Sequence, residues 1–125
     1  MFPGKIIAGV LLLFFMTPSV FAMSKEEKKE FDRIANLSMP QLTAEAAKAL
    51  ENKYPGEEWS AYNFPQFVYT NDSTEIAYKI AAKEPVLLSN IFCYCFCERM
   101  GHESLLSCFF KEGKAGGEFD PHGSR

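Results

Sequence analysis

The alternation of hydrophobic and polar positions predicts a first helix over residues 24–37. Its first half is a run of charged side chains, and a narrow apolar stripe follows. Ser24 begins the segment and Glu27 stands three positions later, which is the signature of a capping box. The stripe consists of Phe31, Ile34, Ala35 and Leu37. We interpret the charged half as a solvated helix face without a function of its own.

Two further helices are predicted by spacing and composition. Residues 42–54 are rich in alanine and leucine, which favour helix, with Thr43 as the expected cap and Pro55-Gly56 as the end. Residues 73–83 repeat apolar side chains at helical spacing, and Pro85 either ends that helix or begins another turn. A short helix is also predicted near 103–110.

Between the second and third helices lies an aromatic segment, residues 57–72. Its rings are interspersed with polar residues and interrupted by Pro65, which predicts an irregular connector with room for a short strand. Such rings can form a ligand platform, but packing into a core or an interface is the more common use. The fold class expected from all these elements is mainly α: a small helical domain with a Cys-rich loop and a short C-terminal helix.

The first 22 residues have the form of a signal peptide. Lys5 precedes an apolar run that ends at Met16, and the small-residue pattern Val20-Phe21-Ala22 follows. The run is shorter than the roughly 20 residues of a membrane span. We therefore expect export to the periplasm or the exterior, with membrane association through an uncleaved signal as the alternative. The rest of the chain divides into an N-terminal helical region with its connector (23–72) and a Cys-rich region (73–125).

Composition narrows the functional classes. Hydrophobic residues make up 47% of the 125, which suits one small folded domain. Asp and Glu (16) outnumber Lys and Arg (13), so the net charge is −3 and the basic field of a nucleic-acid binder is missing. All four cysteines and both histidines follow residue 92. In an exported protein such thiols are bridged, metal-bound or shielded.

Three of the cysteines, Cys93, Cys95 and Cys97, occupy alternate positions. In an extended segment their sulfurs share one face, and in a loop two or three can converge, whereas in a helix only the first and third are neighbours. Every complete disulfide pairing with Cys108 must join two members of this closely spaced trio, where bridge geometry is poor. A pure disulfide framework is therefore disfavoured.

Metal binding suits the spacing better, because thiolates are soft ligands for Cu(I) and Zn(II). His102 follows a flexible glycine, and His122 stands in a turn after Asp120-Pro121. Cu(I) is favoured slightly, with Zn(II) or another thiophilic ion as the alternative. The expected ligands are Cys93, Cys95, Cys97, Cys108, His102 and His122.

Residues 75–110, with the run out to His122, resemble the PCYCGC-motif family of exported bacterial proteins. The matching residues are Ala77-Tyr78, Ala81-Ala82, Pro85, Cys93-Tyr94-Cys95, Cys97, Gly101-His102, Ser104-Leu105, Cys108-Phe109 and His122. The resemblance implies a small envelope protein suspected of metal binding, with no established catalysis. Phe92 and Phe96 replace the proline and glycine of the motif. Relatives also carry further cysteines beyond the histidine, so this region is expected to be shortened at Arg125.

Three functions remain as hypotheses. The first is an exported soft-metal binding protein, which is not an enzyme. The second is an interaction module of the cell envelope stabilised by disulfides. The third is a thiol–disulfide oxidoreductase, in which Arg99 or His102 lowers a thiol pKa, although the chain has no Cys-x-x-Cys motif. Hydrolase chemistry is excluded because nothing supplies an oxyanion hole.

Overall fold

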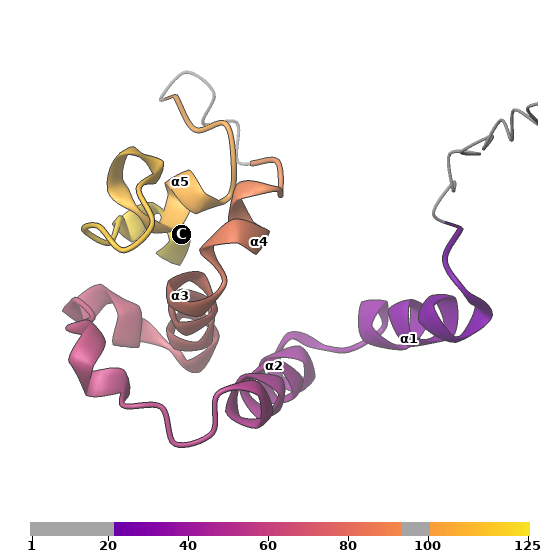
Figure 1. The fold of residues 1–125 in the computed structure, drawn as a ribbon. Coiled ribbons are helices and arrows are strands. Elements are labelled where there is room, and N and C mark those ends of the chain that lie inside the picture. The colour runs from indigo at the N-terminus through magenta and orange to yellow at the C-terminus, as the bar shows by residue number, and fades with distance from the viewer. Residues whose placement is uncertain (1–21, 94–100) are drawn as a thin grey trace, which may run out of the picture. The chain divides into compact units, whose positions relative to one another are not determined.

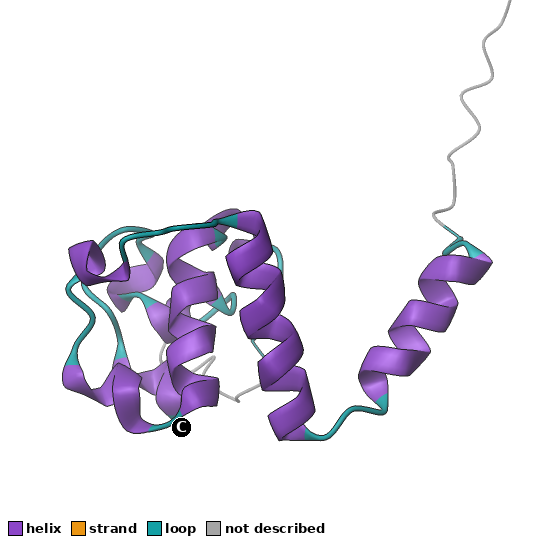
Figure 2. Ribbon diagram, turned by 90° about the horizontal axis from the view of Figure 1, so that it is seen from below, coloured by secondary structure: helices purple, strands orange, loops and turns teal. Residues whose placement is uncertain are grey.

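The computed structural model describes residues 22–93 and 101–125, and its elements are α-helices and 3-10 turns (Figures 1 and 2). The prediction of a mainly α protein is confirmed. The chain divides into two units, Met1–Ala35 and Asn36–Arg125. The predicted signal peptide falls almost wholly on residues 1–21, outside the described part. Among the described residues, no helix has the length and apolar character needed to span a membrane.

Helix α1 (Lys25–Ala35) begins as the sequence predicts. The backbone N–H of Glu27 donates to Ser24 Oγ (3.1 Å), and the backbone N–H of Ser24 donates to the Glu27 carboxylate (2.7 Å). This reciprocal pair satisfies two donors that the first helical turn would leave open. No residue of α1 is buried, and Phe31 is 62% exposed. The helix is therefore stabilised by its own cap and ion pairs rather than by a core.

Helix α2 (Met39–Lys53) begins earlier than predicted, and Thr43 is not its cap. The cap is Ser38, whose backbone N–H donates to the Gln41 side chain (3.0 Å). Pro40 lies in the first turn, where its missing N–H costs no hydrogen bond. The Thr43 hydroxyl instead donates to the Met39 carbonyl oxygen and lies 2.7 Å from Ser73 Oγ, which links α2 to α3.

The aromatic segment forms two 3-10 turns, η1 (Trp59–Tyr62) and η2 (Gln66–Thr70). The sequence pattern allowed for a short strand in this segment. That prediction is wrong, because the described residues of the segment contain no strand (Figure 2). The rings stack on one another, with the Tyr62 and Phe64 centroids 5.6 Å apart. Phe64 and Val68 are buried, so the segment packs as core.

Helix α3 (Asp72–Lys83) is the centre of the second unit (Figure 1). Its cap is Asn71, whose side chain accepts from the backbone N–H of Thr74 (2.9 Å). It contacts α2, η2 and the elements that follow it along the chain. Tyr78 and Ala81 on α3 are fully buried, and they hold the aromatic turns on one side and the Cys-rich region on the other.

The C-terminal part consists of short elements folded back onto α3. They are α4 (Pro85–Ser89), α5 (Leu106–Phe109), η4 (Lys111–Gly113) and η5 (Pro121–Ser124). Pro85 thus begins a new turn. Isolated antiparallel bridges join Phe92 to Ser104 and Phe110 to Phe119. The buried core that results consists of Phe64, Val68, Tyr78, Ala81, Leu88, Cys93, Leu106, Cys108, Phe109 and Phe110.

Candidate functional site

Two of the predicted ligands, Cys93 and Cys108, meet inside the core. Their Sγ atoms lie 3.2 Å apart, and the residues are 2% and 4% exposed. Cys93 follows the backbone bridge between Phe92 and Ser104, and Cys108 lies on α5 one turn beyond that bridge. Both are thiols in this structure. Two cysteines 15 positions apart in the sequence therefore place their sulfurs side by side in the core.

The two histidines form a second pair. The ring centroids of His102 and His122 lie 5.1 Å apart, with an angle of 76° between the ring planes. Nδ1 of His102 is buried, and it has no hydrogen-bond partner within the described ranges 22–93 and 101–125. Within those ranges this nitrogen therefore lacks the hydrogen-bond partner that a buried polar atom ordinarily has.

The turn that carries His122 is fixed against α5 by the backbone. Asp120 Oδ1 accepts from the His122 backbone N–H (2.8 Å), and the Asp120 backbone N–H donates to the Phe109 carbonyl oxygen (2.9 Å). The Tyr78 hydroxyl donates to the Asp120 carbonyl oxygen. The turn that carries the second imidazole is thus bonded to Phe109 of α5, the residue next to Cys108.

Gly123 allows this close approach. A Cβ atom at this position would lie 2.9 Å from two ring carbons of Phe109 and 3.0 Å from the Cys108 carbonyl oxygen. Because that ring is buried, Gly123→Ala is expected to lower the free energy of unfolding by about 1–3 kcal/mol, the range of overpacked sites. Urea unfolding followed by tryptophan fluorescence measures this loss. The exposed Ser60→Ala variant is the control, and an equal effect of the two substitutions would contradict the packing argument.

The structure therefore gathers the predicted ligands as two pairs. Cys95 and Cys97 lie in residues 94–100, outside the described part. Within the described part, no three histidine, cysteine, aspartate or glutamate side chains lie close enough together to hold a metal ion. The sequence did not indicate that Tyr78, Asp120 and Gly123 hold the turn with His122 against the helix with Cys108. The turn signal at Asp120-Pro121 pointed to one of them.

The spacing of the thiol pair can be compared with that of two thiolates on one zinc ion. Two sulfurs that each lie about 2.3 Å from one tetrahedral zinc ion are about 3.8 Å apart. The observed 3.2 Å is within about 0.6 Å of that value. In the part of the chain that the structure describes, the two buried thiols and the His102 imidazole belong to separate pairs and do not form one three-ligand site.

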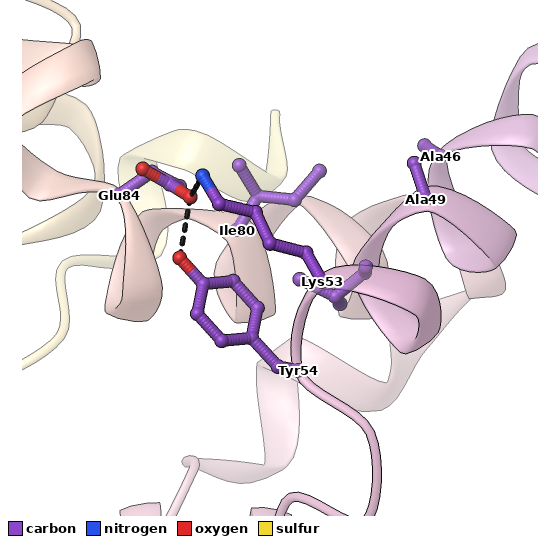
Figure 3. Close-up of a pocket in the computed structure, with 7 residues that line it drawn as sticks. Ala46, Ala49, Lys53, Tyr54, Ile80 and Glu84 are labelled. Carbon is purple, nitrogen blue, oxygen red and sulfur yellow. Dashed lines mark hydrogen bonds and ion pairs between the residues drawn. The ribbon is translucent and has the colours of Figure 1, made fainter.

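A separate groove runs between α2 and α3 (Figure 3). It encloses about 290 Å³ and is lined mainly by apolar atoms of Ala46, Ala49, Leu50 and Ile80. At one end, Lys53 and Tyr54 both bond the Glu84 carboxylate. These bonds, with the Lys53 bond the stronger influence, lower the pKa of Glu84. The polar groups at this end of the groove bond to one another, so we assign the groove a structural role.

Comparison with known proteins places the chain in a family. The sequence profile described as "Protein of unknown function with PCYCGC motif" matches residues 25–125. The chain belongs to the PCYCGC-motif family. The match extends well beyond the cysteines, since it includes α1, α2 and the aromatic turns. No curated protein and no solved structure matches the chain.

Proposed function

We propose that this PCYCGC-family protein is an exported binding protein for a soft metal ion. Cu(I) is the first candidate and Zn(II) the second. The single observation that carries the proposal is the buried pair of sulfurs 3.2 Å apart, on Cys93 and Cys108. Buried thiols this close provide two soft ligands with little chain entropy left to lose on binding.

The ligand count favours Cu(I). Structural zinc takes four protein ligands, whereas Cu(I) is satisfied by as few as two sulfurs. Cys93 and Cys108 supply these two, whereas His102 and His122 form a separate pair. Storage and delivery of the ion are binding functions, and the proposal assigns no catalytic residue.

Export is part of the proposal and rests on residues 1–22. Outside the cytosol, free thiols oxidise unless they are shielded or coordinated. The burial of Cys93 and Cys108 slows their attack by oxidants, since less than a twentieth of either residue is exposed. A thiol pair that oxidises slowly is suited to carry copper.

Copper titration tests the proposal. The full chain is reduced under anaerobic conditions, freed of reductant, and offered Cu(I) held by bicinchoninate, a coloured chelator. We expect stoichiometric transfer of copper to the protein, with thiolate-to-copper absorption in the near ultraviolet. A variant with all four cysteines changed to serine is the control and should leave the copper on the chelator. Identical curves for the two proteins would refute the proposal.

A further inference from the structure

The backbone around the thiol pair holds the two sulfurs together independently of any ligand. The Leu105 backbone N–H donates to the Ile91 carbonyl oxygen (2.8 Å), and Phe92 bridges Ser104. Cys108 then follows within the turn that begins α5, where its N–H donates to the Leu105 carbonyl oxygen (3.0 Å). The two segments that carry Cys93 and Cys108 are thus joined by backbone hydrogen bonds.

The distance between the sulfurs lies between those of two chemical states. A disulfide requires about 2.05 Å between sulfurs, and two thiolates on one tetrahedral ion require about 3.8 Å. From 3.2 Å, the pair closes by about 1.2 Å to reach the first state and opens by about 0.6 Å to reach the second. Either state thus differs from the observed arrangement by about 1 Å in the distance between the sulfurs.

We infer that Cys93 and Cys108 form a reversible disulfide, and that this bridge and the metal ion compete for the same two sulfurs. The competition rests on the proposed function, whereas the bridge rests on geometry alone. The bridge is specific: it joins Cys108 to the first cysteine of the trio rather than to Cys95 or Cys97. Oxidation then releases the ion, and reduction restores the binding state.

The reaction balances by exchange with a small disulfide, RS–SR. One cysteine thiolate attacks a sulfur of RS–SR, which forms a mixed disulfide and expels one RS⁻. The second cysteine thiolate attacks the protein sulfur of that mixed disulfide and expels the other RS⁻. The two cysteines are oxidised and RS–SR is reduced. The two protons lost by the cysteines leave on the two RSH molecules.

The bridge is tested in the full chain without metal. The variant Cys95→Ser/Cys97→Ser retains only Cys93 and Cys108. Treated with excess oxidised glutathione, it should lose two hydrogens by intact mass, retain no thiol that alkylates, and carry no glutathione. Dithiothreitol should reverse the change. Stable glutathione adducts, or bridges only between two chains, would overturn the inference.

Wild-type protein tests the specificity of the pairing. Trypsin cleaves after Arg99, which separates Cys108 from the other three cysteines, so a cross-linked peptide reports a bridge to the trio. Fragmentation of that peptide should place the bridge at Cys93. The matched variant Cys93→Ala should form any bridge to Cys108 at least tenfold more slowly. A dominant bridge from Cys95 or Cys97 would overturn the pairing.

Copper uptake distinguishes the competition between the disulfide and the ion from the proposed metal-binding function itself. The Cys95→Ser/Cys97→Ser variant is offered Cu(I) on bicinchoninate before and after oxidation, with the wild type in parallel. Loss of uptake on oxidation, with recovery on reduction, supports the competition. Equal uptake by both forms overturns it and leaves the metal-binding proposal standing. Failure of the reduced wild type to take up copper refutes the proposed function and the competition together, and the mass measurements then decide the bridge.

Discussion

Cys108→Ala is expected to weaken Cu(I) binding about a hundredfold. Structural zinc sites with four ligands bind their ion with about 10–16 kcal/mol, so one ligand of such a site accounts for about 3 kcal/mol, or two orders of magnitude in Kd, and we expect a similar share for a thiolate on Cu(I). A site with only two sulfur ligands loses a larger share of its binding free energy when one ligand is removed. Cys108 lies on α5 with its sulfur 3.2 Å from that of Cys93, so its removal deprives the pair of half its donors.

Competition against bicinchoninate at several chelator concentrations measures this loss. Ser107→Ala is the matched control, because it truncates a side chain of similar size at the neighbouring position of α5. Unfolding by urea shows whether each variant is folded at the concentration used. Equal copper affinity of the Cys108 variant and the control would place the ion elsewhere.

Tyr78→Ala is expected to remove about 3–5 kcal/mol from the free energy of unfolding, the range for truncation of a large buried aromatic ring. Tyr78 is fully buried, and its ring meets those of Phe67 and Phe109 edge-on, at centroid distances of 5.6 and 4.8 Å. Because small domains are stable by only about 5–15 kcal/mol, this loss leaves little margin.

Tyr78→Phe isolates the hydroxyl group from the ring. The hydroxyl donates to the Asp120 carbonyl oxygen, and its loss leaves that oxygen without this donor, at a cost of about 1–3 kcal/mol. Urea unfolding followed through Trp59, the one tryptophan of the chain, measures both variants. Tyr69→Phe is the control, because Tyr69 is 47% exposed. A Tyr78→Phe effect no larger than that of the control would contradict the role of the hydrogen bond.

The same hydroxyl gives the protein a dependence on alkaline pH. Burial, and secondly the negative charge of Asp120, raises the pKa of Tyr78 to about 12. An unfolded tyrosine releases its proton near pH 10, so between pH 10 and 12 the folded state binds more protons than the unfolded state. Stability therefore falls as the pH rises through this window. The fall should be smaller in Tyr78→Phe, and equal slopes for the two proteins would contradict it.

Local signals in the sequence predicted the helices well. The reciprocal bonds of Ser24 and Glu27 depend only on residues three apart, so the pattern and the geometry coincide. The start of α2 was misplaced because two capping residues compete there. Ser38 wins, since Pro40 and Gln41 suit the first turn, and Thr43 uses its hydroxyl within the helix and toward Ser73.

The pairing of ligands could not be read from spacing. The sequence grouped six donors by proximity along the chain, whereas the structure pairs Cys93 with Cys108 and His102 with His122. That choice depends on the bridge between Phe92 and Ser104 and on the packing of α5 against α3. Contacts between distant segments of this kind carry no local pattern.

The bond between Tyr78 and Asp120 spans 42 positions. Helix α3 is synthesised before Asp120, so the hydroxyl of Tyr78 gains this acceptor only after residue 120 has been added. Completion of this part of the core therefore follows the synthesis of helix α3. A polypeptide that lacks residue 120 leaves the Tyr78 hydroxyl without this acceptor.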